Sequence, residues 1–144
     1  MLSQLMLGTV ITLVSLLGGA FMWSALNELL LRMEPWLRGP NQHIKSFVVV
    51  SLVAISTMGM TTFGVWLWAI IFQQMSVFST LEEAVYYSLV AYTTLGLGDI
   101  VVPQDLRLLG GMTGANGFLM FGLMTAMITD TLRHVRRVQH HLRD

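Results

Sequence analysis

Two threonines followed by two spaced glycines form the part of this sequence whose residue types are best suited to chemistry. The run reads Thr93-Thr94-Leu95-Gly96-Leu97-Gly98-Asp99. Glycine enters the left-handed backbone region without steric penalty, so glycines at alternate positions allow successive carbonyl oxygens to turn toward one side. Rings of backbone carbonyls can replace the hydration shell of a cation. The pattern therefore predicts a cation site whose ligands are the Thr94 hydroxyl and backbone carbonyls of Thr94, Leu95, Gly96, Leu97 and Gly98.

The composition of the chain predicts a membrane protein. Of its 144 residues, 54% are hydrophobic and 11% are charged, whereas about 25% of the residues in soluble domains are charged. The net charge is zero and there is no cysteine. Binding to nucleic acid is therefore not expected, and disulfides and thiolate metal sites are excluded. The sequence has no catalytic triad and no phosphate-binding loop, and we predict a protein that is not an enzyme and has no cofactor.

Three charge-free stretches predict the membrane-spanning helices. Each is long enough for the roughly 20 apolar residues that cross a bilayer, and the expected helices cover residues 5–31, 44–73 and 106–133. The first stretch has no basic segment in front of it, so we expect a retained helix and not a cleaved signal peptide. The predicted fold is all-α, with three transmembrane helices in each chain.

The segment between the second and third spans predicts a re-entrant loop. Residues 79–102 are too few to cross the membrane twice, yet they are too apolar for an ordinary loop. Ser79 or Thr80 is suited to cap a helix whose first turn holds Glu82 and Glu83. A short helix over residues 84–92 then leads into the glycine-containing run. Non-helical backbone at membrane depth is tolerated where it is buried in protein or lines water.

The distribution of basic residues predicts the topology. Lys and Arg residues concentrate in the first connection and in the C-terminal tail: Arg32, Arg38, Lys45, Arg133, Arg136, Arg137 and Arg143. The positive-inside rule places both regions in the cytoplasm. We therefore expect a multi-pass protein of the cell membrane with its N-terminus outside, its re-entrant loop entering from outside, and lipid as a partner.

Two runs resemble potassium channels. Residues 86–99, YYSLVAYTTLGLGD, resemble the pore helix and selectivity filter of that family, and the G-L-G-D ending is most similar to the second pore loop of two-pore-domain potassium channels. Residues 117–126, GFLMFGLMTA, are similar to the inner helix of minimal two-helix members. The resemblance implies four domains: an additional N-terminal helix (1–34), a cytoplasmic connection (35–45), a pore domain (46–133) and a basic cytoplasmic tail (134–144).

The resemblance also implies roles for single residues. The family is tetrameric and conducts K⁺ passively, so we expect a homotetramer with K⁺ at the filter carbonyls. Tyr86 would donate a hydrogen bond to Asp99 and so support the filter. The remaining implied roles lie on the third span: a gating hinge at Gly117, a central cavity lined by Phe118, Phe121 and Thr125, and an inner mouth formed by Thr129, Asp130 and Arg133.

Several alternatives stay open at this stage. Gly117 is as well suited to close helix packing as to a hinge. Asp130 is better suited to a solvated or paired acid than to a ring of charge at the inner mouth, which stays open as the alternative. Leu95 and Leu97 replace the usual valine or isoleucine and the usual tyrosine of the family, which favours a weakly selective Na⁺/K⁺ channel as one alternative. A non-conducting accessory membrane subunit is the other. The sequence contains no arginine-rich voltage sensor and predicts no gating stimulus.

Overall fold

The protein is all-helical over the residues that its computed structural model describes, which are 1–37, 39 and 42–140. In chain order its elements are α1 (Leu2–Arg32), α2 (Glu34–Leu37), α3 (Gln42–Gln74), α4 (Leu81–Tyr92), the short 3₁₀-helix η1 (Gln104–Leu106) and α5 (Arg107–His140). Three of these helices, α1, α3 and α5, are long and apolar enough to cross a membrane. The predicted fold class is therefore confirmed for the single chain.

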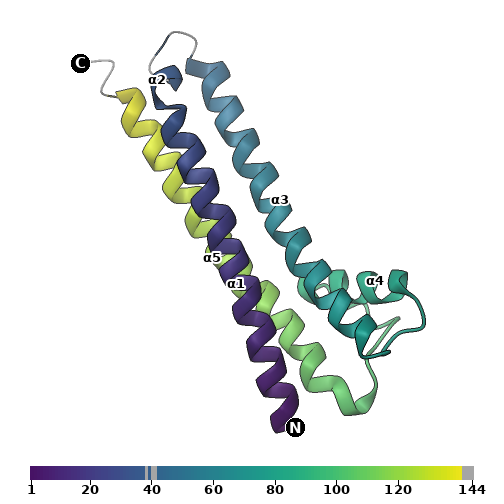
Figure 1. Ribbon diagram of the computed structural model, residues 1–144. Helices are drawn as coiled ribbons and strands as arrows, with labels where there is room; N and C mark the ends of the chain where they lie inside the picture. Colours follow the sequence, from purple (N-terminus) through teal and green to yellow (C-terminus); the bar gives the residue numbers. More distant parts are fainter. Residues whose placement is uncertain (38, 40–41, 141–144) are drawn as a thin grey trace.

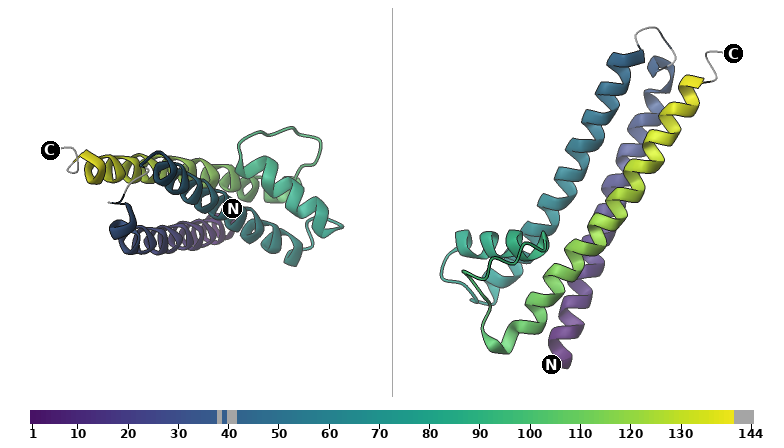
Figure 2. Two further views of the ribbon diagram at one scale, coloured as in Figure 1. Left: turned by 90° about the horizontal axis from the view of Figure 1, so that it is seen from above. Right: turned by 180° about the vertical axis from the view of Figure 1, so that it is seen from behind.

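The three long helices run beside one another, and α4 lies across one end of them (Figures 1 and 2). The N-terminus lies at the same end of the molecule as α4. Helix α2 and the C-terminal end of α5 lie at the opposite end (Figure 1). Helix α4 packs against both α3 and α5. The segment between α3 and α5, which contains α4, thus enters and leaves the bundle at the same end, as a re-entrant segment does.

A capping box fixes the start of α4. The Thr80 side chain accepts a hydrogen bond from the backbone N–H of Glu83, and the Glu83 carboxylate accepts from the backbone N–H of Thr80. The same carboxylate accepts from the N–H of Ser79 at 3.0 Å. Of the two caps that the sequence allows, Thr80 is the residue used. The two acids of the first turn also complement the positive end of the helix.

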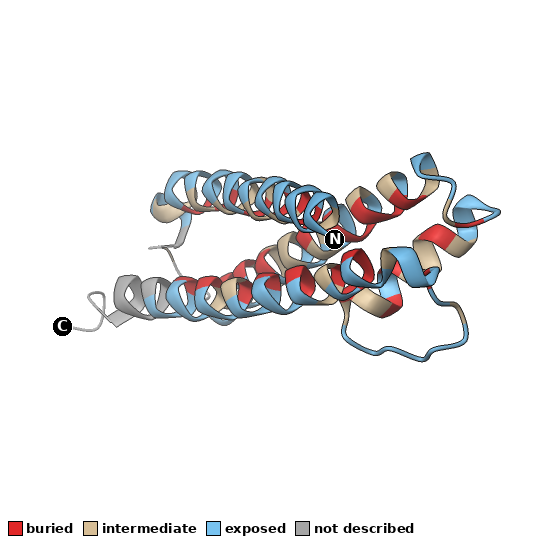
Figure 3. Ribbon diagram, turned by 90° about the horizontal axis from the view of Figure 1, so that it is seen from below, coloured by how far each residue is buried: buried red, intermediate tan, exposed pale blue. Residues whose placement is uncertain are grey.

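An aromatic cluster holds the turn between α3 and α4 in place. The ring of Phe72 lies 5.7 Å from Trp68, 5.9 Å from Phe78 and 5.4 Å from Tyr87, measured between centroids. Tyr87 also contacts Phe78 at 5.1 Å. Phe72 and Trp68 are fully buried, and the buried residues follow the lines where the helices meet (Figure 3). Offset and edge-on aromatic pairs of this kind stabilise by more than their buried area alone.

Helix α1 approaches the other long helices closely at its glycines. A Cβ added at Gly19 would lie 2.8 Å from the Cε of Met120 on α5, and one added at Gly8 would also collide with α5, at Met112. Small residues allow helices in membranes to pack at such short range. The outer side of α1 remains exposed in the single chain (Figure 3). The first span is therefore an integral part of the bundle.

Candidate functional site: a backbone cation pathway

Tyr92, the last residue of α4, fixes the position of the site. Its side chain is fully buried. A Cβ added at Gly64 of α3 would overlap the tyrosine ring and hydroxyl, and one added at Gly117 of α5 would overlap the backbone carbonyl of Tyr92. The ring also contacts Phe121 edge-on, at 6.4 Å between centroids. Two glycines therefore create the space into which the end of α4 fits.

These contacts place the C-terminal end of α4 at a defined depth in the bundle. Gly64 and Gly117 each lie ten residues from the ends of α3 and α5 that flank α4. At 1.5 Å per residue this distance is about 15 Å, which is half of a hydrocarbon core of about 30 Å. The end of a helix with unsatisfied carbonyls carries partial negative charge. This end of α4 is therefore suited to stabilise a cation near mid-membrane.

The backbone that follows α4 alternates in handedness. The φ angle is +59° at Thr94, +59° at Gly96 and +78° at Gly98. A Cβ added at either glycine would meet no atom within 4 Å, so glycine is needed there for its conformation and not for space. The positive φ angle of Thr94 is unexpected, because a β-branched residue rarely adopts positive φ. The sequence contains no signal for that angle, since the residue type argues against it.

Hydrogen bonds orient the first peptide units of this segment. The N–H of Thr94 donates to the carbonyl of Ala91 at 2.9 Å, and the N–H of Leu95 donates to the carbonyl of Val90 at 3.0 Å. The N–H of Gly96 donates to the same Val90 carbonyl at 3.2 Å. In a trans peptide the carbonyl points opposite to the N–H of the same unit. The carbonyls of Thr94 and Leu95 therefore point away from α4, as ion ligands must.

The far end of the segment is tied back to α4 by a side-chain contact. The hydroxyl of Tyr86 donates a hydrogen bond of 2.6 Å to the carboxylate of Asp99. This contact lowers the pKa of Asp99, and it raises the pKa of Tyr86 because the neighbouring carboxylate disfavours a phenolate. It is the bond that the potassium-channel resemblance implies. The segment is therefore anchored at both ends, by Tyr92 and by Asp99.

Between these anchors the segment makes little contact with its own chain. The side chain of Leu95 is 63% exposed and that of Leu97 is 59% exposed. The sequence predicts that both leucines pack behind the strand. The single chain does not supply that packing, so any atoms that cover these leucines must come from outside it.

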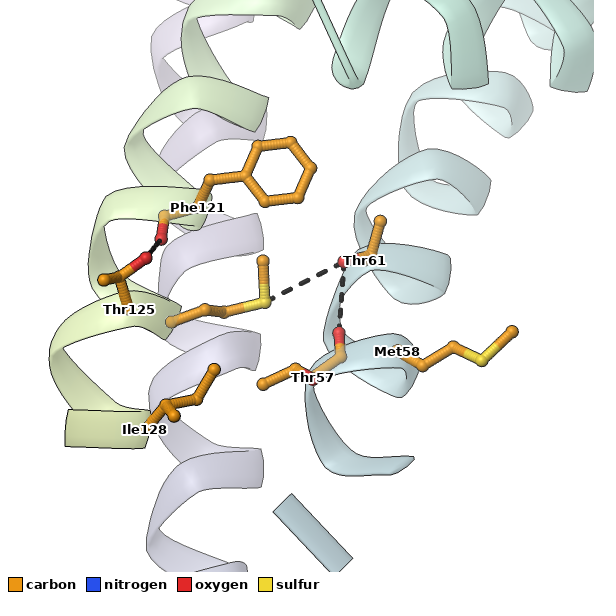
Figure 4. A pocket seen from close by; sticks show the side chains of 7 residues that line it. Thr57, Met58, Thr61, Phe121, Thr125 and Ile128 are labelled. Atoms are coloured by element: carbon orange, nitrogen blue, oxygen red, sulfur yellow. Dashed lines mark hydrogen bonds between the residues drawn. The ribbon is translucent and has the colours of Figure 1, made fainter. Parts of the chain in front are cut away.

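A cavity of about 290 Å³ lies between α3 and α5, on the side of Tyr92 away from α4 (Figure 4). Its lining includes Phe121 and Thr125 of α5 opposite Thr57 and Thr61 of α3. The Thr125 hydroxyl donates to the backbone carbonyl of Phe121 at 2.9 Å and the Thr61 hydroxyl to that of Thr57 at 3.1 Å. Their methyl groups and the Phe121 ring make the cavity mostly apolar. Phe121 and Thr125 thus line a cavity within one chain, and the central cavity expected between chains stays a prediction.

Phe118 and the predicted inner-mouth residues lie on exposed parts of α5. Phe118 is 72% exposed and does not line the cavity, and Asp130 and Arg133 are exposed near the other end of the helix. The hydroxyl of Thr129 donates to the backbone carbonyl of Thr125 at 2.9 Å. Helix α5 is continuous through Gly117 and on to residue 140. Residues 141–144 of the predicted tail lie outside the described residues.

Comparison with known proteins identifies the family. A family model described as an ion channel matches residues 48–134, which is more than half of the chain. No curated protein and no solved structure matches it significantly. The matched range contains α4, the segment after it and most of α3 and α5. The chain therefore belongs to this family of ion channels.

Proposed function

We propose that this member of the ion channel family conducts K⁺ passively through a central pore formed by four copies of the chain. One observation carries the proposal: φ is positive at Thr94, Gly96 and Gly98, every second residue, directly after a helix that ends near mid-membrane. This alternation is what aims a column of backbone carbonyls at a dehydrated ion. We call residues 94–98 the filter segment.

The need for several copies follows from the geometry of one filter segment. A single segment supplies carbonyls to one side of an ion, and closed cyclic symmetry completes the ring. The exposed side chains of Leu95, Leu97 and Phe118 supply apolar surface that neighbouring copies would cover. Four copies give each carbonyl level a ring of four oxygens, with the C-terminal end of each α4 directed toward the same ion.

The distribution of charged residues supports one orientation of the chain across the membrane. The exposed acids Glu82, Asp99 and Asp105 lie at the end of the molecule that holds α4. Acidic groups at a pore mouth raise the local concentration of cations. The basic residues Arg32 and Lys45 lie at the opposite end, which the positive-inside rule assigns to the cytoplasm. The N-terminus and the filter entrance would then face outward.

A weakly selective cation channel is the second candidate. The observation that favours it is Leu97, whose side chain is exposed and cannot donate the hydrogen bond that a tyrosine would make at this position. The Tyr86–Asp99 bond supports the outer end of the filter segment in compensation. The two candidates share one pore and differ in the ratio of K⁺ to Na⁺ permeability.

Ion flux into lipid vesicles tests both candidates. Purified protein is reconstituted into vesicles loaded with K⁺ and diluted into Na⁺, and tracer uptake is measured with and without external Ba²⁺. We expect K⁺-driven uptake that Ba²⁺ blocks and that empty vesicles lack. Equal uptake driven by K⁺ and by Na⁺ gradients would favour the weakly selective channel. Absence of any flux from a well-folded assembly would contradict conduction and favour the accessory subunit.

A further inference from the structure

Helix α1 lies outside the matched ion channel region, yet it contacts the helices that build the pore. Its glycines set its register against α5, because Gly8 meets Met112 and Gly19 meets Met120. The lower residue number pairs with the lower in both cases, so α1 and α5 run parallel, as Figure 1 shows. Residues of α1 between Gly8 and Gly19 therefore lie level with the part of α5 that includes Gly117.

Ser15 lies in this stretch of α1 and is fully buried. Its hydroxyl and the hydroxyl of Tyr92 are both buried without a hydrogen-bond partner among the described residues. Gly18, about one turn after Ser15, meets Phe63 of α3, and Tyr92 lies against the next residue, Gly64. Asn116 of α5 is also fully buried, and within the described part of the chain neither the nitrogen nor the oxygen of its amide has a hydrogen-bond partner. Asn116 falls midway between Met112 and Met120, on the stripe of α5 that meets α1. Three buried polar side chains from three helices thus lie around one level of the bundle.

Polar groups in such a position need an explanation. Burying a hydroxyl or an amide without a hydrogen bond costs free energy, and nearly all buried polar groups in native proteins are paired. An alanine at position 15 would be as small and would avoid that cost. A hydroxyl can both donate and accept, so the hydroxyls of Ser15 and Tyr92 are chemically able to satisfy each other. Close helix packing alone therefore does not explain why residue 15 is a serine and not an alanine.

A second contact joins α1 to the connection between the filter segment and α5. The side-chain amide of Gln4 donates to the backbone carbonyl of Asp105 in η1. Helix η1 belongs to the connection that leads from Asp99 to α5. Helix α1 therefore lies near the chain on both sides of the filter segment, with Ser15 close to the level of Tyr92 before it and Gln4 bonded to Asp105 after it.

We propose that Ser15 is a positioning residue for the filter segment, and that α1 therefore contributes to conduction. The proposal rests on the proposed channel function. Ser15 acts through Tyr92, whose ring and hydroxyl lie against Gly64 of α3 and whose carbonyl lies against Gly117 of α5. Thr94 follows two residues later with a strained φ of +59°. Such strain persists only where the surroundings hold it in place.

A double-mutant cycle on the full-length protein tests this inference. The variants are Ser15→Ala, Tyr92→Phe and their combination, with Ser24→Ala as the matched control, because Ser24 is exposed on the same helix. The measured quantities are the permeability ratio of K⁺ to Na⁺ in vesicles and the midpoint of thermal unfolding. If the two hydroxyls bond to each other in the conducting protein, as the proposal requires, each single variant should lower the ratio about fivefold, which is the effect of losing one hydrogen bond. The double variant should lower it no further, and Ser24→Ala should match the wild type.

The outcomes separate this inference from the proposed function. A lower unfolding midpoint with an unchanged permeability ratio would overturn it, because Ser15 would then contribute to packing alone. Additive effects of Ser15→Ala and Tyr92→Phe would overturn it as well, since the two groups would act independently. If the wild type does not conduct, the proposed function fails. In that case coupling between the two substitutions in the unfolding midpoint still tests whether Ser15 holds Tyr92.

Discussion

The end of α4 and the filter segment are neighbours in sequence, but they differ in what surrounds them. Tyr92 is fully buried within its own chain, against Gly64 of α3 and Gly117 of α5. Leu95 and Leu97, three and five residues later, are largely exposed. The single chain therefore completes the packing around Tyr92, which we call the support of the candidate ion site. It leaves the ion site itself incomplete. Substitutions in the support should act on folding, whereas substitutions in the filter segment should act on conduction.

The largest expected effect is that of Gly117→Ala in the support. The added Cβ would overlap the backbone carbonyl of Tyr92, which cannot move without displacing the end of α4. We expect a loss of about 3 kcal/mol or more of stability, at the upper end of the cost of overpacking. Thermal unfolding in detergent measures this loss.

Gly111→Ala is the matched control for this prediction. A Cβ added at Gly111 would meet no atom within 4 Å, and both glycines lie on α5. The control should unfold close to the wild-type temperature. Wild-type stability of Gly117→Ala would show that the contact with Tyr92 is not rigid. It would contradict the packing role of Gly117 and favour a gating hinge instead.

Gly96→Ala should have the opposite profile to Gly117→Ala. An alanine at φ +59° is strained by about 1–2 kcal/mol, yet its side chain would collide with nothing in the chain. We therefore expect a folded protein whose K⁺ flux falls by tenfold or more, since about 1.4 kcal/mol on a barrier is worth that factor. Flux and thermal unfolding are measured on the same preparation. Full conduction in this variant would contradict the assignment of the filter segment.

Tyr86→Phe should have a smaller effect at the outer end of the filter segment. The change removes the 2.6 Å hydrogen bond to Asp99 and leaves the ring in place. We expect the permeability ratio of K⁺ to Na⁺ to fall about fivefold. Tyr87→Phe, the same change one residue later, is the control, because the Tyr87 ring belongs to the aromatic cluster. Equal permeability ratios in the two variants would remove the supporting role of the Tyr86–Asp99 bond.

The smallest expected effect is a dependence on external pH. The pKa of Asp99 is lowered from its ordinary value of 3.8 by the bond from Tyr86. A lowered pKa in the folded state means that the bond stabilises above the ordinary value and is lost as the pH falls through the lower one. Conduction should therefore stay constant as the external pH falls toward 4 and decline below that. In Tyr86→Phe the decline should begin at a higher pH, and a wild-type midpoint near neutrality would contradict the assignment to Asp99.

Local chemistry in the sequence predicted much of the scaffold. The three spans follow from runs without charge, and the start of α4 follows from Thr80 and Glu83, which pair within one turn. The positive φ values at Gly96 and Gly98 could be expected because glycine is the residue that tolerates them. Each of these features depends on residues close together in the chain.

Long-range packing decided what the sequence could not predict. The positive φ of Thr94 goes against its residue type, and it depends on the anchored end of α4. Gly117 was equally suited to a hinge and to packing until Tyr92 was located beside it. Ser15 belongs to no recognisable motif, and its burial beside α4 depends on how α1 packs against two other helices.

Mixing wild-type and Gly96→Ala chains tests the central claim most directly, because that claim is that each chain supplies one quarter of a shared ion site. The two chains are coassembled at known ratios, and K⁺ flux is measured in vesicles at constant total protein. If four chains share one site and one defective chain impairs it fully, flux at equal amounts should fall to about one sixteenth of the wild-type value above the residual flux of Gly96→Ala measured alone. Flux that falls to about one half, in proportion to the wild-type fraction, would contradict a shared filter.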